Sequence, residues 1–207
     1  EIIFSMEGGK DYLIDRGINS TVNMEKVHHI GNGVDIPKFE YNKRNFVVND
    51  ELINHEDIFK VVYCGSIREA NNVGFLVDVA KVIQSKGIEG IQFIIYGDGP
   101  ERARLERICV EQDISNIRFE GFVDKKYIPY ILSKSDLNVL VYKQAGTWKY
   151  GGSQNKLNEY IVSGKPILSS IDMSYNQIVK HNCGRVCATS DPEVFAELIS
   201  AGLPNAI

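Results

Sequence analysis

Residues 150–166 read YGGSQNKLNEYIVSGKP and are the most informative stretch of the chain. Glycines 151 and 152 open a helical pattern that ends at Gly164. At about 100° per residue, Lys156 and Glu159 fall on one side of this helix, whereas Leu157 falls on another and supplies apolar contact. Glycine lets the backbone approach a ligand closely, and the free N–H groups of a first helical turn attract anions. The stretch therefore predicts a ligand-facing helix between two strands of a sheet.

Two charged residues of this helix indicate a ligand. Lys156, one turn into the helix, is placed to add positive charge to a bound phosphate. Glu159, a further turn along, is placed to accept hydrogen bonds from the vicinal hydroxyls of a sugar. Together they predict a nucleoside diphosphate with its ribose. On spacing alone an alternative is equally good: Ser153 caps the helix, and Lys156 and Glu159 form an exposed ion pair worth about 0.2–0.5 kcal/mol.

Composition excludes several classes of protein. The chain has 207 residues, 43% of them hydrophobic and 24% charged, with a net charge of −4, which is typical of a globular protein that does not bind nucleic acid. No apolar run approaches the roughly 18–20 residues that a membrane span needs, and no signal-peptide pattern follows Glu1. The cysteines are scattered without the spacing of a zinc site, so we expect reduced, buried thiols: Cys64, Cys109, Cys183 and Cys187.

From residue 59 onward, apolar runs of strand length alternate with helical patterns, which is typical of βαβ units. The expected strands cover residues 60–64, 92–96, 117–119, 137–140, 166–169 and 185–187. The expected helices cover residues 73–86, 101–112, 127–133, 153–163, 175–181 and 192–200. The predicted fold class is therefore α/β, a Rossmann-like doubly wound parallel sheet of about six strands.

Glycine-containing loops follow the first four of these strands, at residues 65–68, 97–100, 121–123 and 144–153. Because a doubly wound sheet binds its ligand at the carboxyl ends of its strands, these loops are expected to form the site. The first loop lacks the G-x-G-x-x-G fingerprint, which counts against a dinucleotide dehydrogenase. The loop at residues 97–100 is also explained as a tight turn whose proline opens a helix.

The first 57 residues have a different pattern. A helix at about residues 8–16 and a strand at about 27–30 lead into Gly31-Asn32-Gly33-Val34-Asp35. Residues 38–57 are polar with little apolar periodicity, so the first 57 residues are interpreted as the end of a preceding domain followed by a linker. The chain starts within an apolar run rather than at a methionine, so we expect it to be a piece of something longer.

Short motifs recur in a fixed order along nearly the whole chain: Asn32 to Asp35, Tyr63 to Gly65, Tyr96 to Pro100, Phe119 to Val123, Ser135 to Leu137 and Glu159 to Pro166. In this order and at these intervals they resemble the retaining glycosyltransferases of the GT-B fold, family 4. The resemblance implies that residues 1–57 are the end of an amino-terminal acceptor domain plus linker. Residues 58–207 would then be the carboxy-terminal nucleotide-sugar-binding domain, truncated at its end, which is the carboxy-terminal half of a GT-B fold.

The resemblance also implies roles for individual residues. The second glutamate of the family's Glu-x7-Glu motif binds the donor ribose and corresponds to Glu159, whereas the first, which contacts the sugar, falls at Gly151. Ser66 and Asn71 replace the usual diphosphate-binding arginine and lysine, which makes Arg68 and Lys156 the substitutes. The implied diphosphate and donor contacts are Arg68, Lys156, Gly151, Gly152, Ser153, Asn155 and Ser66. Gly121, Phe122 and Val123 form the implied base loop, with Phe122 as a core residue in the alternative, and Gly97 and Asp98 belong to a cleft loop.

The segment around Glu159 is most similar to transferases that build bacterial surface polysaccharides. The implied reaction is transfer of a hexosyl or N-acetylhexosaminyl group from a nucleotide-sugar, expected to be a UDP-sugar, to a glycan or lipid-linked acceptor with retention of configuration. No metal and no cofactor are expected. The implied location is the cytoplasm, with contact to the inner membrane surface through the amino-terminal domain. Because catalytic residues are expected mainly in that domain, the fragment is expected to bind donor but to transfer little or no sugar.

Two other functions fit the sequence. A UDP-sugar epimerase of GT-B architecture would need acid–base residues at the cleft, where Glu69, Asp98 and Glu120 are the loop carboxylates without a clear partner. A non-catalytic nucleotide-binding or scaffolding module would explain the residues found at positions 66, 71 and 151. A folded chain that binds no nucleotide would favour the scaffolding module over both enzymes.

Overall fold

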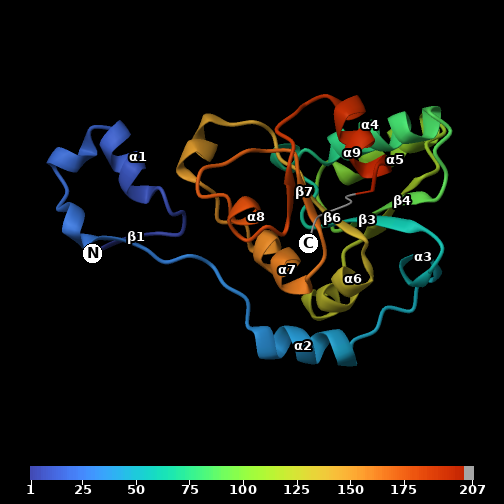
Figure 1. Cartoon of the computed structure of the whole chain (residues 1–207), viewed down its shortest axis with the longest axis horizontal. Helices are drawn as coiled ribbons and strands as arrows, with labels where there is room; N and C mark the ends of the chain where they lie inside the picture. The colour runs from blue at the N-terminus through green and yellow to red at the C-terminus, as the bar shows by residue number, and fades with distance from the viewer. Residues whose placement is uncertain (203–207) are drawn as a thin grey trace.

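The computed structural model describes residues 1–202, which contain two parallel sheets of unequal size (Figure 1). The larger sheet has six strands in the order β5-β4-β3-β6-β7-β8, as in a doubly wound fold. These strands are β3 (Phe59–Cys64), β4 (Ile91–Tyr96), β5 (Ile117–Gly121), β6 (Leu137–Leu140), β7 (Ile167–Ser169) and β8 (Gly184–Val186). The smaller sheet pairs β1 (Ile2–Phe4) with β2 (Val27–His29).

Helices cover both faces of the larger sheet because its central strands are apolar on both sides. Along β3, Val61 and Tyr63 join one buried cluster and Val62 and Cys64 the other. One face is covered by α4 (Val73–Ser85), α5 (Arg102–Glu111) and α9 (Pro192–Ser200). The other is covered by α3 (Glu51–Asn54), α6 (Ile128–Lys134), α7 (Asn155–Ser163) and α8 (Gln177–Lys180). The predicted α/β fold with a parallel sheet of six strands is confirmed.

Two packed helices, which the weak apolar periodicity did not predict, occupy much of residues 36–57. In α2 (Ile36–Asn45), the side chain of Asp35 accepts a hydrogen bond from the Lys38 N–H at 3.0 Å, and Phe39 is buried. In α3, Asp50 caps the helix in the same way and Ile53 is fully buried. An aspartate cap satisfies the free N–H groups of a first turn, so two short, polar helices form without strong apolar periodicity.

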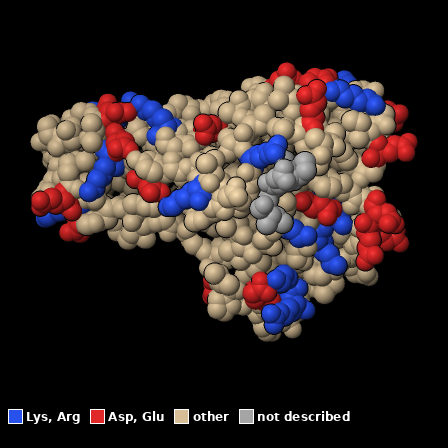
Figure 2. Space-filling view, viewed as in Figure 1, with Lys and Arg blue, Asp and Glu red and all other residues tan. Residues whose placement is uncertain are grey.

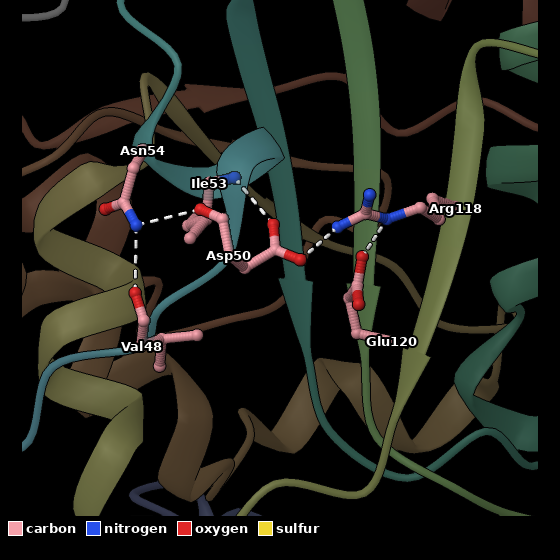
Figure 3. A network of polar contacts seen from close by, with 6 residues as sticks. All are labelled: Val48, Asp50, Ile53, Asn54, Arg118 and Glu120. Carbon is pink, nitrogen blue, oxygen red and sulfur yellow. Dashed lines mark hydrogen bonds and ion pairs between the residues drawn. The ribbon is translucent and has the colours of Figure 1, made fainter.

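A polar network fastens α3 to the sheet (Figure 3). Arg118 on β5 donates to the Asp50 carboxylate at 2.5 Å and also pairs with Glu120. The Asn54 side chain donates to the carbonyl oxygens of Val48 and Asp50 at 2.9 and 2.8 Å. The chain between the two sheets is therefore held against the larger one.

The first 30 residues form a small unit that contacts the larger sheet through a loop (Figure 1). Its helix α1 (Gly9–Asp15) lies beside the loop that contains the 3₁₀ helix η5 (Gly146–Tyr150). The Gly8 N–H donates to the Tyr150 carbonyl at 3.0 Å, and Asp15 pairs with Lys149 at 2.6 Å. This loop leads directly into the glycines at 151 and 152.

Three further findings concern the surface and the thiols. Figure 2 shows acidic and basic side chains interspersed on one face; on α2, Glu40 pairs with Lys43 at 2.6 Å. No helix in residues 1–202 is long and apolar enough to cross a membrane. The four cysteines are free, as predicted, but only Cys64 and Cys109 are buried, so the expectation that all four are buried is wrong. Cys183 and Cys187 are half-buried because they flank β8 at the edge of the sheet.

Candidate nucleotide site

The order of the strands places the expected ligand crevice between β3 and β6. These strands are neighbours, yet the chain continues from β3 toward β4 and from β6 toward β7, on opposite sides. In doubly wound sheets a ligand binds where the strand order reverses, outside the carboxyl ends of the two central strands. Tyr63 and Cys64 end β3, and Tyr142 follows β6 closely. These residues form the floor of the candidate site.

The loops after β3, β4 and β5 are locked together by backbone contacts. The Ile67 N–H donates to the Asp98 carbonyl at 2.8 Å, and the Gly97 N–H donates to the Gly121 carbonyl at 2.7 Å. A methyl group on Gly97 would overlap the carbonyl oxygen of Gly65, and φ at Gly97 is +142°. Close approach between neighbouring loops therefore requires this glycine. Gly65, Gly97 and Gly121 all lie at the carboxyl ends of their strands, on the same side of the sheet, as predicted.

Helix α7 begins at Asn155, two residues later than predicted. Gln154 has the extended backbone of an N-cap, and its side chain makes no capping hydrogen bond, so the alternative in which Ser153 caps the helix is wrong. The rotation of α7 is fixed by Tyr160, which is fully buried and accepts a hydrogen bond from the Cys64 N–H at 2.9 Å. Because Lys156 lies one turn before Tyr160, it faces the end of β3 as well.

Lys156 lies at the end of β3 and contacts aromatic groups. Its Nζ atom donates to the Tyr63 hydroxyl at 2.7 Å and lies 4.2 Å from the centre of the Tyr63 ring. It also lies 5.0 Å from the centre of the Tyr142 ring. A methyl group on Gly65 would come within 2.6 Å of this nitrogen, so the glycine makes room for it. Aromatic faces attract a cation but supply no full negative charge.

Burial lowers the pKa of Lys156 to about 7, and the Cys64 thiol opposes this only in part. Burial also raises the pKa of Tyr142 to about 12. Within residues 1–202 no carboxylate forms an ion pair with Lys156. Glu159 instead pairs with Lys125 at 3.3 Å, so the alternative of a surface pair between Lys156 and Glu159 is wrong. Burial therefore disfavours the charged form of Lys156, and no carboxylate among the described residues compensates for this.

Glu159 faces a different space from Lys156. Its side chain is 17% exposed and lines a cavity of about 510 Å³ together with Asn155 and Lys125. The far wall of this cavity is the segment from Asn32 to Asp35 and the α2 side chains that follow it. A carboxylate at the side of such a cavity can accept two hydrogen bonds from neighbouring hydroxyl groups.

The glycine turn before α7 contacts the linker that joins β2 to α2. Asn32 donates to the Ser153 hydroxyl at 2.9 Å, and Asn158 donates to the Asn32 carbonyl at 3.0 Å. Gly151 has φ +86°, and Gly152 and Ser153 line a second cavity of about 370 Å³. Glu7, His29 and Lys180 also line this cavity. The structure thus brings residues 151–155 together with the linker.

Other predicted residues lie elsewhere around the edge. Arg68 is exposed and lines a separate cavity of about 190 Å³ with Arg104 and Lys143. The Ser66 hydroxyl donates to the Asn71 side chain at 3.3 Å. Phe122 is 78% exposed, so the alternative of a core residue is wrong, and its predicted role in the base loop stays a prediction.

Sequence reasoning missed the groups that surround Lys156 and Glu159. Tyr63 and Tyr142 form the aromatic walls, and Lys125 neutralises Glu159. A signal was present for the tyrosines, since both stand at the carboxyl ends of adjacent central strands. Asn32 is part of the motif from Asn32 to Asp35, but the sequence around it gave no sign of its hydrogen bond to Ser153.

An α/β domain with this strand order has the doubly wound fold, and Lys156 lies at the carboxyl ends of its central strands. The model of the family described as Glycosyl transferases group 1 matches residues 58–205, and the chain belongs to this family. The predicted resemblance to GT-B glycosyltransferases is thereby confirmed.

Three known proteins illustrate the similarity. The 2-deoxystreptamine N-acetyl-D-glucosaminyltransferase of Niallia circulans is 30% identical over 133 residues, which are 64% of this chain and 32% of the relative. The amylovoran biosynthesis glycosyltransferase AmsK of Erwinia amylovora is 21% identical over 84% of this chain and 41% of its own length. The chain therefore spans about a third to two fifths of these relatives. The structure of HepE from Anabaena, in complex with UDP and glucose, has a TM-score of 0.73 at 16% identity and covers 99% of this chain and 54% of that one.

Proposed function

We propose that the crevice at the ends of β3 and β6 binds the diphosphate of a nucleotide-sugar donor, and that the protein transfers the sugar to an acceptor hydroxyl. One observation carries the proposal: the half-buried Lys156 contacts Tyr63 at the end of β3 and has no carboxylate partner within the described residues. A diphosphate would supply the missing charge. As the nucleoside diphosphate leaves, a cation beside it offsets the charge that develops, which is the stabilisation that such a transfer needs most.

Two further groups complete this donor site. The N–H groups of the first turn of α7 have no side-chain cap and stand beside the glycine turn, where a phosphate is favoured. Glu159 lies on the neighbouring side of α7 and would accept hydrogen bonds from the ribose. Adjacent faces of helix α7 would therefore bind the diphosphate and the ribose. The exposed Phe122, beside Gly121, is proposed to lie against the base.

The finer assignment rests on relatives and on the sequence. We infer a UDP-sugar because the similar Anabaena structure holds UDP and glucose, and because the α7 segment resembles polysaccharide transferases. A hexosyl or N-acetylhexosaminyl group fits the name of the Niallia circulans relative, and a glycan or lipid-linked acceptor fits that of the Erwinia amylovora relative. Retention of configuration follows from the family resemblance alone. Residues 1–57 are proposed to end the acceptor domain and residues 58–207 to bind the donor.

Calorimetric titration of the chain with UDP, GDP and ADP tests the proposal. We expect UDP to bind with the highest affinity and to compete with a UDP-sugar. A folded chain that binds none of the three nucleotides would contradict the proposal and favour the non-catalytic scaffold. Assay of the full-length protein with a panel of UDP-sugars would then identify the sugar that is transferred.

Glu159→Gln is expected to weaken binding of UDP about tenfold and to change binding of 2′-deoxy-UDP much less. Replacing the carboxylate removes a charge-assisted hydrogen bond to the 2′-hydroxyl, worth about 1.5–3 kcal/mol, and the deoxynucleotide lacks this bond from the start. Calorimetry with both nucleotides gives the two ratios.

Lys125→Met is the matched control for Glu159→Gln. It removes the partner of Glu159 but leaves the carboxylate, and the pair it breaks has a 79% exposed lysine, so only about 0–1 kcal/mol is at stake. An equal loss of affinity for UDP and 2′-deoxy-UDP in Glu159→Gln would show that Glu159 does not touch the 2′-hydroxyl.

A further inference from the structure

The groups around Lys156 come from β3, from α7 and from the loops after β3 and β6. From β3 it meets Tyr63 and Cys64, and from the residue just beyond β6 it meets Tyr142. The loop after β3 adds only the neutral side chains of Ser66 and Asn71. On α7 itself, Tyr160 is buried against Cys64, and the Glu159 carboxylate is paired with Lys125. No acid on these elements neutralises an ammonium ion at Lys156.

The hydrogen-bond pattern accommodates both the amine and the ammonium form. Tyr63 donates its own proton to the Ser66 carbonyl at 2.8 Å, so its oxygen is left to accept from Lys156 at 2.7 Å. An amine and an ammonium ion both have a proton for that bond. The nitrogen is therefore not tied to one charge state by its partners. Its charge depends on whether an anion is present.

We propose that the nucleotide diphosphate binds together with one proton, which Lys156 takes up from solvent as the diphosphate enters the crevice. The inference rests on the proposed function and adds a dependence on pH to it. In the empty site the amine –NH₂ prevails above neutral pH; in the occupied site it accepts H⁺ and becomes –NH₃⁺ against the phosphate oxygens. When the diphosphate leaves, the proton returns to solvent, so no bond other than N–H forms or breaks.

The proposal predicts how affinity changes with pH. Burial lowers the pKa of Lys156 to about 7 in the empty site, and a neighbouring dianion raises it when occupied. Between these two values only the protonated fraction binds tightly. Affinity for the diphosphate is therefore expected to fall about tenfold for each pH unit above about 7, until the pKa of the occupied site is reached.

Calorimetry at about pH 8.5 tests proton uptake directly. UDP is fully ionised there, so its own titration does not contribute. The heat of UDP binding is measured in two buffers that differ in ionisation enthalpy, and the slope gives the number of protons taken up. We expect close to one proton for the unmodified chain and none for Lys156→Arg, because a guanidinium stays charged throughout this range. Affinity of Lys156→Arg for UDP should also stay constant between pH 7 and 9.

The outcomes separate the two proposals. Binding of UDP by the unmodified chain without proton uptake would overturn the coupling and leave the donor site intact. Absence of UDP binding at every pH would overturn the proposed function, and the coupling with it. Uptake of a proton that persists in Lys156→Arg would assign the proton to another group and also overturn the coupling.

A second measurement needs no nucleotide and remains available if the arginine variant folds poorly. The unfolded chain holds the Lys156 proton up to its ordinary pKa of 10.5, whereas the empty folded site loses it at about 7. Stability linked to Lys156 therefore rises with pH between these values, since the unfolded state binds more protons. Lys156→Met should exceed the unmodified chain in stability most at pH 7 and progressively less toward pH 9. A difference that stays constant over this range would contradict the proposal.

Discussion

Replacing Gly97 with alanine is expected to lower the free energy of unfolding by about 2–6 kcal/mol. The new methyl group would overlap the Gly65 carbonyl oxygen, and overpacking of this kind costs about 1–3 kcal/mol. The backbone at Gly97, with φ +142°, is one that side-chain-bearing residues rarely adopt, which costs about another 1–3 kcal/mol. Urea denaturation followed by circular dichroism measures the loss. Because the same contact aligns the loops after β3 and β4, UDP affinity should fall with stability.

Gly87→Ala separates the two contributions. Gly87 also has a positive φ, +66°, but nothing lies within 4 Å of a methyl group placed there. This variant should therefore lose only the backbone part, about 1–2 kcal/mol. If both variants lost the same amount of stability, close packing of the two loops would not be what makes Gly97 necessary.

Lys156→Met is expected to weaken binding of UDP about 10- to 150-fold at pH 7 and to leave binding of uridine nearly unchanged. A hydrogen bond from a charged donor is worth about 1.5–3 kcal/mol, and uridine has no phosphate to receive it. Methionine keeps the length and apolar stem of lysine, so packing against Tyr63 and Tyr142 should survive. Calorimetry with the two ligands measures the ratio.

The matched control is the same substitution at an exposed lysine outside the proposed site, Lys26→Met. It changes the net charge equally, so a long-range electrostatic effect would appear in both variants. If Lys156→Met weakened uridine as much as UDP, the lysine would support the fold of the site rather than contact phosphate. If Lys156→Met changed the binding of neither ligand, the diphosphate would bind at another place along the carboxyl ends of the strands.

The parts of the fold that were predictable are those with local signals. The central strands β3 and β4 contain continuous apolar runs, and each strand of the larger sheet lies within a residue or two of its predicted place. The polar helices α2 and α3 were missed because their stability comes from aspartate caps and from Phe39 and Ile53, which are buried against distant elements. A cap followed by a single apolar residue is a weak pattern in sequence.

The candidate site was predictable in position but not in its contacts. Chain topology carries the carboxyl ends of the strands to one edge whatever their side chains are, so the loops could be named in advance. The partner of Lys156 is Tyr63, 93 residues earlier in the chain, and helix periodicity says nothing about that distance. Periodicity places Glu159 beside Lys156, but burial turns one toward the sheet and leaves the other at a cavity.

The polar network around Arg118 also bears on how the protein avoids aggregation. Within the part of the chain that the structure describes, residues 1–202, β5 is an outer strand of the sheet and pairs on one side only, with β4. Unpaired strand edges are templates onto which another molecule can add a strand, and charged side chains on the edge discourage this. Arg118, Glu120 and Asp50 gather three charges at that strand, so an incoming strand would have to strip water from ions before it could bond. The same contacts that fasten α3 thereby protect the free edge of the sheet against self-association.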